Sequence, residues 1–284
     1  MKKTAIICRD SAPGFFLSLY VRKNSKKKFI FCLKNPALNI LKDYLGNFKN
    51  YNINEAIKKS TNIIVGTGKT EFEKKIMFKL VKQNKEFTCF VDHSSNFKNR
   101  FSFRGFKIHP KKFWTIDSIT NKEIKKHFPN SSIKTINLKN NLSKKKRKKY
   151  FILYLAGCMS LKNKKLNDKF KSFINAEKKA LKIFLDFISK NNIFFEDKKI
   201  LARLHPEEFY KRKIIKKLKD KNILLSKKNL LNDIEDSNYI FGGNSTSLIY
   251  AKKLNKIVVN CLSKNQILQK NYNILIKEFL INAN

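Results

Sequence analysis

The chain has 284 residues, 42% of them hydrophobic, which is enough for one large domain or two modest domains with buried cores and excludes a disordered or fibrous protein. Its formal net charge of +42 would ordinarily indicate a polyanionic partner. Only seven of the 63 basic residues are arginine, however, and the lysines are spread over all the predicted helices. Nucleic-acid readers depend on arginine for bidentate contacts, so this composition disfavours a nucleic-acid partner. It favours a solvated basic surface or peripheral contact with an anionic membrane.

The amino-terminal stretch MKKTAIICRD has too short an apolar run for a signal peptide, and no later segment is long enough to span a bilayer. The cysteines are odd in number, widely spaced and set in apolar runs: Cys8, Cys32, Cys89, Cys158 and Cys261. This pattern is typical of buried thiols in a reducing compartment, and it indicates neither a disulfide framework nor a metal site. We therefore expect a cytoplasmic protein, peripheral at the inner face of the membrane.

The first half of the chain alternates short apolar runs with helical spacing. Strands are expected at 4–8, 28–33, 62–65, 87–91 and 113–116, with helices at 71–85 and 118–128 among them. Alternation of this kind predicts βαβ units and a parallel sheet.

A polar and basic run, LKNNLSKKKRKK, interrupts this pattern, and a second alternating series follows it. We expect an N-terminal Rossmann-like domain at 1–140, a linker at 141–149 and a C-terminal Rossmann-like domain at 150–284. Two such α/β domains facing each other across a cleft would bind ligands beyond the carboxyl ends of their strands. The last residues, 271–284, have helical spacing and are expected to pack back across the first half.

The stretch NIIVGTGKTEFEKK resembles a nucleotide-triphosphate loop, with Lys69 in the place of the phosphate-binding lysine and Asp92 as a magnesium ligand. The first glycine of the P-loop pattern would fall at Ile63, inside the expected strand, so the loop is too short. The alternative is a tight strand-to-helix turn, in which backbone N–H groups and a threonine hydroxyl line the cleft. That turn consists of Gly66, Thr67 and Gly68.

The segment ILARLHPEEF places Arg203, His205 and Pro206 between an expected strand and a helix. A guanidinium and an imidazole at the carboxyl end of a strand can bind a phosphate and neutralise it as it leaves. The alternative is a capping or core histidine.

A second turn, GGNSTS, also lies between a strand and a helix. Its glycines allow close approach to the backbone, and its hydroxyls and free N–H groups can bind phosphate. The alternative is an ordinary helix cap. The residues expected to bind phosphate here are Gly243, Asn244, Ser245, Thr246 and Ser247.

The R-x-H-P turn, followed by D-I-x-x-S-x-x-x-x-G-x-x-S-T-S-L-x-x-A, resembles the C-terminal half of GT-B-type glycosyltransferases. The similarity is to bacterial sialyltransferases and polysialyltransferases, capsule-polymer transferases and CDP-glycerol polymerases. In those families the two motifs bind the nucleotide phosphates of a sugar donor, which implies the same role for His205 and for 245–247. More loosely, G-T-G followed by D-H-x-x-N-x-x-x-R-F, beginning at Asp92, is similar to surface-polysaccharide proteins.

The acidic D/E-D/E-G motif of the sialyltransferases is absent, and Tyr250 stands where many relatives have a glutamate. The sequence therefore leaves the identity of the general base open. The candidates are Asp92 and His93, because both follow a strand that would end at the cleft. A structural cap is the alternative for this pair.

Taken together, these motifs predict a metal-independent glycosyltransferase with no cofactor. It would move a sugar, on the resemblance a CMP-linked acidic sugar, from a nucleotide donor to a surface glycan or glycolipid acceptor. Three alternatives stay open: a nucleotide-sugar epimerase or hydrolase of the same fold, a phosphotransferase using Lys69, and a lysine-rich binding protein without catalysis.

Overall fold

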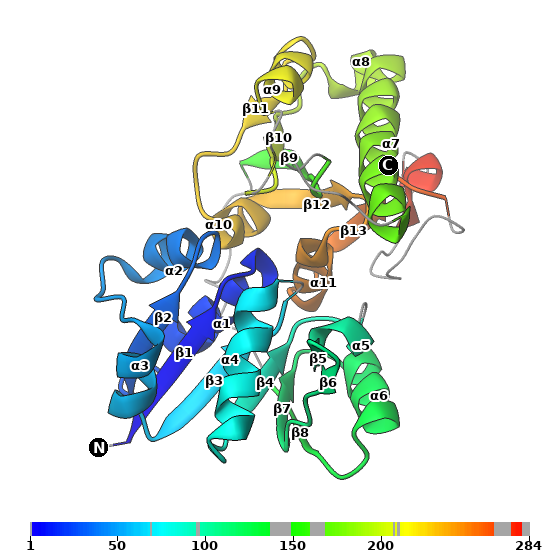
Figure 1. The fold of residues 1–284 in the computed structure, drawn as a ribbon. Coiled ribbons are helices and arrows are strands. Elements are labelled where there is room, and N and C mark those ends of the chain that lie inside the picture. The colour runs from blue at the N-terminus through cyan, green and yellow to red at the C-terminus, as the bar shows by residue number, and fades with distance from the viewer. Residues whose placement is uncertain are drawn as a thin grey trace. The chain divides into compact units, whose positions relative to one another are not determined.

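The computed structural model describes residues 2–68, 70–94, 97–136, 149–159, 168–206, 208, 211–263 and 274–279. The chain forms two compact units, Met1–Asn140 and Asn141–Asn284 (Figure 1). The expected linker 141–149 lies outside the described residues except for its last position. None of the helices in the described part of the chain is long and apolar enough to cross a membrane.

The N-terminal unit is built on a six-stranded parallel sheet in the order β2-β1-β3-β4-β7-β8. Its strands are β1 (Lys3–Cys8), β2 (Lys28–Leu33), β3 (Asn62–Gly66), β4 (Thr88–Val91), β7 (Lys112–Thr115) and β8 (Ser132–Thr135). A small hairpin pairs β5 (Ser102–Phe103) with β6 (Phe106–Lys107). The helices are α1 (Ser11–Lys23), α2 (Ala37–Leu45), α3 (Ile53–Lys59), α4 (Glu71–Lys82), α5 (Phe97–Arg100) and α6 (Ser118–His127).

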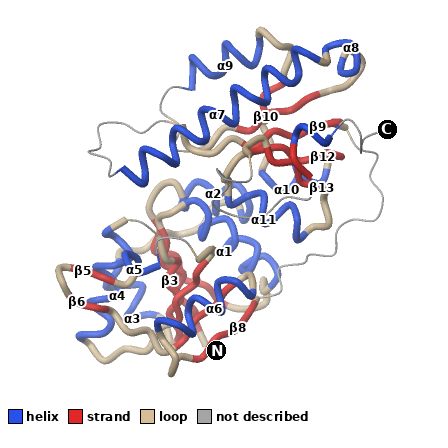
Figure 2. Tube along the Cα trace, turned by 90° about the vertical axis from the view of Figure 1, so that its right-hand side faces the viewer, coloured by secondary structure: helices blue, strands red, loops and turns tan. Residues whose placement is uncertain are grey.

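The C-terminal unit has a second six-stranded parallel sheet, in the order β11-β10-β9-β12-β13-β14. Its strands are β9 (Tyr150–Leu155), β10 (Ile200–Arg203), β11 (Leu224–Leu225), β12 (Ser237–Gly242), β13 (Ile257–Asn260) and β14 (Ile274–Leu275). The helices are α7 (Asp168–Lys190), α8 (Asn192–Phe195), α9 (Lys211–Lys219), α10 (Leu230–Glu235) and α11 (Thr246–Lys253). Figure 2 shows these strands between α7 and α9 on one side and α10 and α11 on the other.

Both sheets are covered on two faces, which explains why their central strands are apolar throughout instead of alternating with polar residues. In the C-terminal unit, α7 places Ala180, Phe184 and Ile188 on the sheet at four-residue spacing. Phe184 stacks on Tyr154 of β9 with ring centroids 4.4 Å apart. The five cysteines are buried and none forms a disulfide, as expected of small core side chains.

The end of the chain differs from the expected helix packed across the first half. Residues Ile274–Leu275 instead form β14 on the edge of the C-terminal sheet, and Ile276–Glu278 form a 3-10 helix. Phe279 is fully buried, with its ring 4.8 Å from those of Phe241 and Tyr239. The apolar residues of this segment thus complete the core of their own unit; residues 280–284 lie outside the described part.

We expect Phe279→Ala to lower the free energy of unfolding by about 3–5 kcal/mol, because it opens a cavity among packed aromatic rings. Urea unfolding monitored by circular dichroism measures the effect. The matched control is Phe106→Ala, whose side chain is 60% exposed, and it should change stability by less than about 0.5 kcal/mol. Equal effects of the two substitutions would contradict this packing.

Candidate functional site

The carboxyl edge of the C-terminal sheet has a topological switch point between β9 and β12. From β9 the chain proceeds outward to β10 and β11, and then returns to the other side of β9 to form β12, β13 and β14. Ligands of parallel sheets bind beyond the strand ends at such points. The loops after β9 and β12 therefore define the candidate site of this unit.

A buried carboxylate joins these two loops. Glu177 of α7 accepts hydrogen bonds from the backbone N–H of Gly157 at 3.0 Å and of Asn244 at 2.5 Å. Burial raises the pKa of Glu177 from 4.5 to about 7, although the two backbone donors act in the opposite direction. The carboxylate fits because the loops are glycine-rich at the contact: a Cβ at Gly157 would lie 2.4 Å from Glu177 Cδ, and one at Gly243 would lie 2.9 Å from Ala180 Cβ.

The Ser/Thr turn follows Asn244, the second hydrogen-bond donor to Glu177, and begins helix α11. Ser245 is the N-cap, and its Oγ accepts the N–H of Ser247 at 3.3 Å. The side chains of Ser245, Thr246 and Ser247 are half-buried, whereas Gly243 and Asn244 are buried. The turn is thus a conventional helix cap, as the alternative interpretation held, and it also presents hydroxyls and first-turn N–H groups at the sheet edge.

Asn260, at the end of β13, supports the same turn from the other side. Its Nδ2 donates to the carbonyl of Gly243 at 3.0 Å, and its Oδ1 accepts the N–H of Leu262 at 2.7 Å. The sequence analysis missed this residue. The available signal was a polar side chain ending an otherwise apolar strand.

The His-Pro turn is tied to the loop after β9 by a second buried glutamate. The N–H of Glu208 donates to the carbonyl of His205 at 3.1 Å, and its carboxylate accepts the N–H of Met159 at 2.7 Å. His205 is half-buried and Pro206 is exposed; Glu207, Phe209 and Tyr210 lie outside the described residues. The loops after β10, β9 and β12 are neighbours along one sheet edge. Glu208 connects the loops after β10 and β9, and Glu177 connects the loops after β9 and β12.

Arg203 holds the end of β10 to the next elements of the unit. Its Nη1 lies 2.9 Å from Asp233 Oδ2 of α10 and 3.1 Å from the hydroxyl of Ser226, and it also contacts the carbonyl of Lys228. Its Nε and Nη2 have no hydrogen-bond partner among the residues that the structure describes. Arg203 is therefore a structural ion-pair partner that retains two donors at a side chain 25% exposed.

In the N-terminal unit, Asp92 and His93 belong to a buried network. Asp92 is 1% exposed, and its Oδ1 lies 2.8 Å from Nη1 of Arg100, which also donates to the carbonyl and hydroxyl oxygens of Thr67 at 3.2 Å each. The Nε2 of His93 lies 2.6 Å from Nη2 of Arg100. Burial alone would raise the pKa of Asp92, but His93 and Arg100 outweigh it and hold that pKa below its ordinary value. This arrangement favours a structural role for Asp92 over the general-base role.

The turn after β3 differs in one respect from expectation. The Thr67 side chain is fully buried and donates to the carbonyl of Phe90 at 2.9 Å, so its hydroxyl cannot line a cleft. Ile63 is buried within β3, paired with Ala5, so the arch of a P-loop cannot form. Lys69 lies outside the described residues.

The N-terminal sheet has its own switch point, between β1 and β3, and an acidic pair lies there that the sequence analysis missed. Glu73 of α4 accepts the N–H groups of Arg9 at 2.7 Å and Asp10 at 3.3 Å, and it also accepts the hydroxyl of Thr70. Burial, with Asp10 as a further cause, raises the pKa of Glu73 from 4.5 to about 7. The backbone of Gly68 packs so closely on Asp10 that a Cβ would lie 1.9 Å from Oδ2. The signal in the sequence was an aspartate two residues after the end of the first strand.

No group of three or more His, Cys, Asp or Glu side chains in the described ranges could hold a metal ion.

The raised pKa of Glu177 predicts a specific pH dependence of stability. Between pH 4.5 and about 7 the folded chain keeps a proton that the unfolded chain has released, so the free energy of unfolding falls as the pH rises through this window, by up to about 1.4 kcal/mol per pH unit for the one group. We expect Glu177→Gln to remove this contribution, so that the free energy of unfolding of the native protein falls relative to that of the variant as the pH rises. Denaturant unfolding at several pH values measures it, with the exposed Glu196→Gln as control. A control and a variant with the same pH profile would contradict the assignment.

No protein-family model matches the sequence, and no curated protein is significantly similar to it. Solved structures resemble it in fold. UDP-GlcNAc 2-epimerase of Methanocaldococcus jannaschii, in complex with UDP-GlcNAc and UDP, matches with a TM-score of 0.59 and 17% identity over 100% of this chain and 91% of its own. A further UDP-N-acetylglucosamine 2-epimerase matches with a TM-score of 0.57 and 12% identity over 100% and 88%. MurG of Acinetobacter baumannii matches with a TM-score of 0.51 and 8% identity over 98% and 86%. The chain thus has the two-domain α/β fold of the GT-B type.

Proposed function

We propose that this chain is a nucleotide-sugar-dependent glycosyltransferase whose donor phosphates bind at the carboxyl edge of the C-terminal sheet. The observation that carries the proposal is the joining of three adjacent loops by Glu177 and Glu208, because it brings the His205 turn and the Ser245 turn to one edge. The fold is shared with proteins whose names specify UDP-GlcNAc, which supports a nucleotide sugar as the ligand class.

Within this site each residue has a defined task. The N–H groups at the start of α11 and the half-buried hydroxyls of Ser245, Thr246 and Ser247 bind the diphosphate or phosphodiester of the donor. The remaining donors of Arg203 add positive charge at the same edge, and His205 neutralises the departing phosphate. Asn244, Gly243 and Pro206 shape the turns. The preference for a CMP-linked acidic sugar rests on the resemblance of these two motifs to the bacterial sialyltransferases.

In the transfer itself, an acceptor hydroxyl oxygen forms a bond to the anomeric carbon of the donor sugar. The bond from that carbon to the phosphate oxygen breaks, and its electron pair stays on the phosphate. The acceptor proton must go to a base. We assign this role to Asp10 and not to Asp92, because Asp10 is half-buried at its sheet edge while Asp92 is fully buried and paired with Arg100.

One observation favours a second candidate, the epimerisation or hydrolysis of the nucleotide sugar without an acceptor. Two of the solved structures that share the fold are named as UDP-GlcNAc 2-epimerases. Product analysis separates the two functions: an epimerised or free sugar formed in the absence of any glycan favours the second.

The donor site is tested by thermal unfolding of the purified protein with CMP, CDP, UDP, GDP or ATP. A nucleotide present at about 100 times its Kd stabilises the folded state by about 2.7 kcal/mol, so the midpoint rises for the base that the site accepts. We expect His205→Ala to lose both this shift and donor turnover, and the exposed control His109→Ala to keep both. Full donor turnover in His205→Ala would overturn the proposed donor site.

The base is tested by Asp10→Asn, which should lower kcat for transfer by at least about 100-fold, the usual effect of losing a general base. Nucleotide-induced stabilisation should persist, since Asp10 is not among the residues proposed to bind the donor phosphates. Asp43→Asn, on the exposed surface of α2, is the matched control and should retain full kcat. An active Asp10→Asn enzyme, together with an inactive but folded Asp92→Asn enzyme, would return the role to Asp92.

A further inference from the structure

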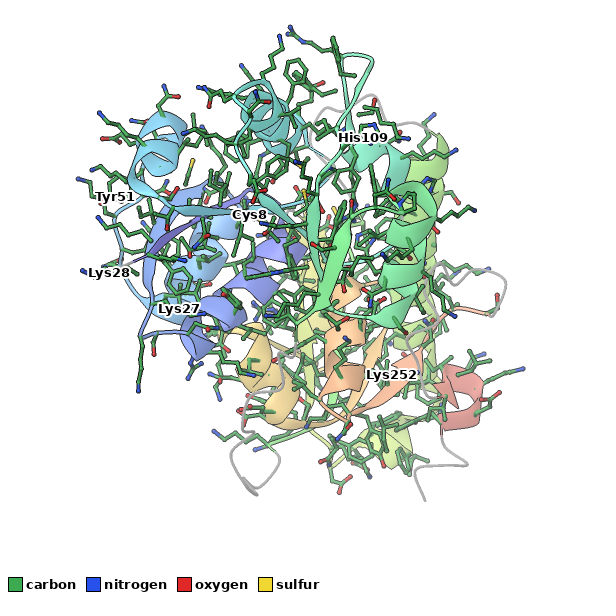
Figure 3. The ribbon with its side chains drawn as sticks, turned by 90° about the horizontal axis from the view of Figure 1, so that it is seen from below. Cys8, Lys27, Lys28, Tyr51, His109 and Lys252 are labelled. Atoms are coloured by element: carbon green, nitrogen blue, oxygen red, sulfur yellow. The ribbon has the colours of Figure 1, made fainter. Side chains whose placement is uncertain are left out.

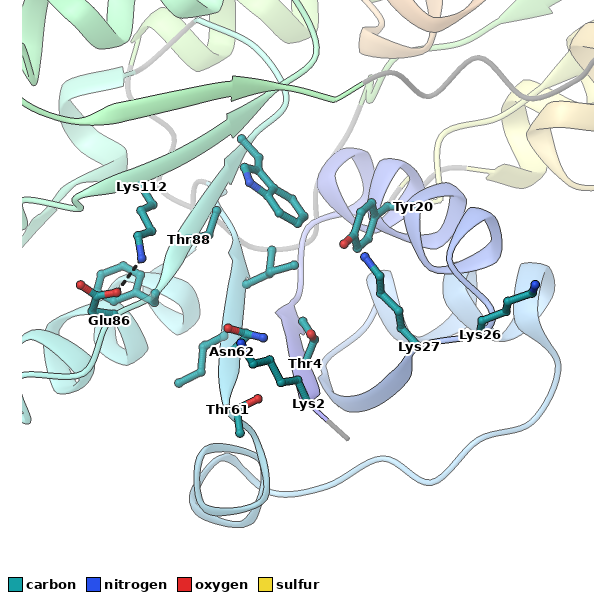
Figure 4. A pocket seen from close by; sticks show the side chains of 14 residues that line it. Lys2, Thr4, Tyr20, Lys26, Lys27, Thr61, Asn62, Glu86, Thr88 and Lys112 are labelled. Atoms are coloured by element: carbon teal, nitrogen blue, oxygen red, sulfur yellow. Dashed lines mark hydrogen bonds and ion pairs between the residues drawn. The ribbon is translucent and has the colours of Figure 1, made fainter.

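A pocket of about 530 Å³ lies at the amino ends of the strands in the N-terminal unit (Figure 4). It is formed by the first residues of β1, β3, β4 and β7, and by the end of α1 with the segment that precedes β2. Because the strands of this sheet are parallel, their amino ends are at the opposite edge from the turns that follow β1 and β3. The pocket is therefore separate from the Asp10–Glu73 pair, and its volume falls within the ordinary range for small-molecule sites, about 300–1,000 Å³.

Two half-buried aromatic rings form one wall of this pocket. Tyr20 of α1 and Trp114 of β7 have ring centroids 4.9 Å apart and planes inclined by 60°. Around them the strand starts contribute polar groups: Thr4, Thr61, Asn62 and Thr88. An aromatic wall beside hydroxyl and amide groups is suited to a ring that has one apolar face and a polar rim.

Positive charge surrounds this wall. The pocket is lined by four lysines and one acid, Glu86, whose carboxylate lies 2.6 Å from Lys112 Nζ. The other three lysines, Lys2, Lys26 and Lys27, form no ion pair with any residue that the structure describes. In Figure 4 the Lys27 amine reaches toward the hydroxyl of Tyr20. Uncompensated like charges around a concave site attract an anion into it.

The lysines of the pocket are not explained by helix stabilisation. Basic residues in the last turn of a helix complement its dipole, which accounts for Arg22 and Lys23 at the end of α1. Lys26 and Lys27 lie beyond that helix, and they continue into Lys28 at the start of β2. Figure 3 shows Lys27 and Lys28 on the N-terminal unit, with Lys28 projecting outward. The basic surface thus extends from the pocket along the same edge of the sheet.

We propose that this pocket binds a segment of an acidic oligosaccharide. One sugar ring packs on Tyr20 and Trp114, and carboxylates of this and adjacent sugars lie against Lys2, Lys26 and Lys27. Single-stranded nucleic acid fits less well, because the two rings are inclined and do not offer parallel platforms for successive bases, and no arginine lines the pocket. An anionic membrane fits less well because the rings are recessed and do not protrude as interfacial anchors.

Trp114 is the only tryptophan of the chain, so its fluorescence reports directly on the pocket. We expect a short oligosialic acid to change this emission saturably, and a neutral oligosaccharide such as maltohexaose to leave it unchanged. The double variant Lys26→Ala/Lys27→Ala should weaken binding by at least about tenfold. The matched control is Lys216→Ala/Lys217→Ala, which removes two exposed lysines from α9 of the other unit and should bind as the native protein does.

Three results would overturn the proposal: no emission change with the acidic oligosaccharide, equal binding by both double variants, or a stronger saturable response to a single-stranded oligonucleotide or to phosphatidylserine vesicles. The inference does not depend on the sugar-transfer reaction. Nucleotide-induced stabilisation and its loss in His205→Ala are measured separately, so either proposal can fail while the other stands.

Discussion

The candidate donor site depends on the carboxylate of Glu177. Two backbone N–H groups, from the loops after β9 and β12, point into a space closed by α7, where water cannot satisfy them. An unpaired buried N–H group costs about 1–3 kcal/mol, so an acceptor is required at this position. By accepting both bonds the carboxylate fixes the spacing of the loops, and the absence of side chains at Gly157 and Gly243 lets it come so close.

In the N-terminal unit, too, a buried glutamate accepts backbone N–H groups at the switch point of the sheet. Glu73, also from a helix that packs on the sheet, accepts the N–H groups of Arg9 and Asp10 at the switch point of the first sheet. Burial raises the pKa values of both glutamates to about 7, because their hydrogen-bond partners are neutral and supply no opposite charge to offset it. Asp92 is the contrast: Arg100 and His93 supply that charge, and its pKa is lowered. Two buried carboxyl groups thus have pKa values near 7, whereas the pKa of a third lies below its ordinary value.

The scarcity of acids makes their placement informative. The chain has 21 acidic residues against 63 basic ones. Buried acids include Glu73, Asp92, Glu177, Glu208, Asp233 and Asp236, and they accept bonds from backbone N–H groups or pair with arginine or lysine side chains. Burial of a carboxylate is unfavourable unless such partners exist. These six acids thus organise the interior and the loops, while others, such as Asp43 and Glu196, lie at the surface with the lysines.

The local pattern of apolar and polar residues was sufficient to predict the α/β architecture with two parallel sheets. The apolar runs and helical spacing indicated most of the strands and the two parallel sheets, because each strand buried on two faces must be apolar throughout, as TAIIC and YFILYL are. The position of the His-Pro and Ser/Thr turns between a strand and a helix followed from the same reasoning. The hairpin, the strand β14 and the four-residue helices α5 and α8 were beyond it, since they contain too few residues for a period to show.

What only the tertiary structure decided was which polar groups meet. The bonds from Asn244 to Glu177, from Arg9 to Glu73 and from Met159 to Glu208 span 67, 64 and 49 residues. No local pattern predicts a partner at such separations. In the sequence Asp92 and Asp10 look alike, each an acid after an apolar strand, yet Asp92 is fully buried and Asp10 is half-buried. The amino acid sequence by itself determined the sheets and the turns at their edges; long-range packing determined which carboxylates are buried and which partners they have, because these contacts join residues that lie far apart in the chain.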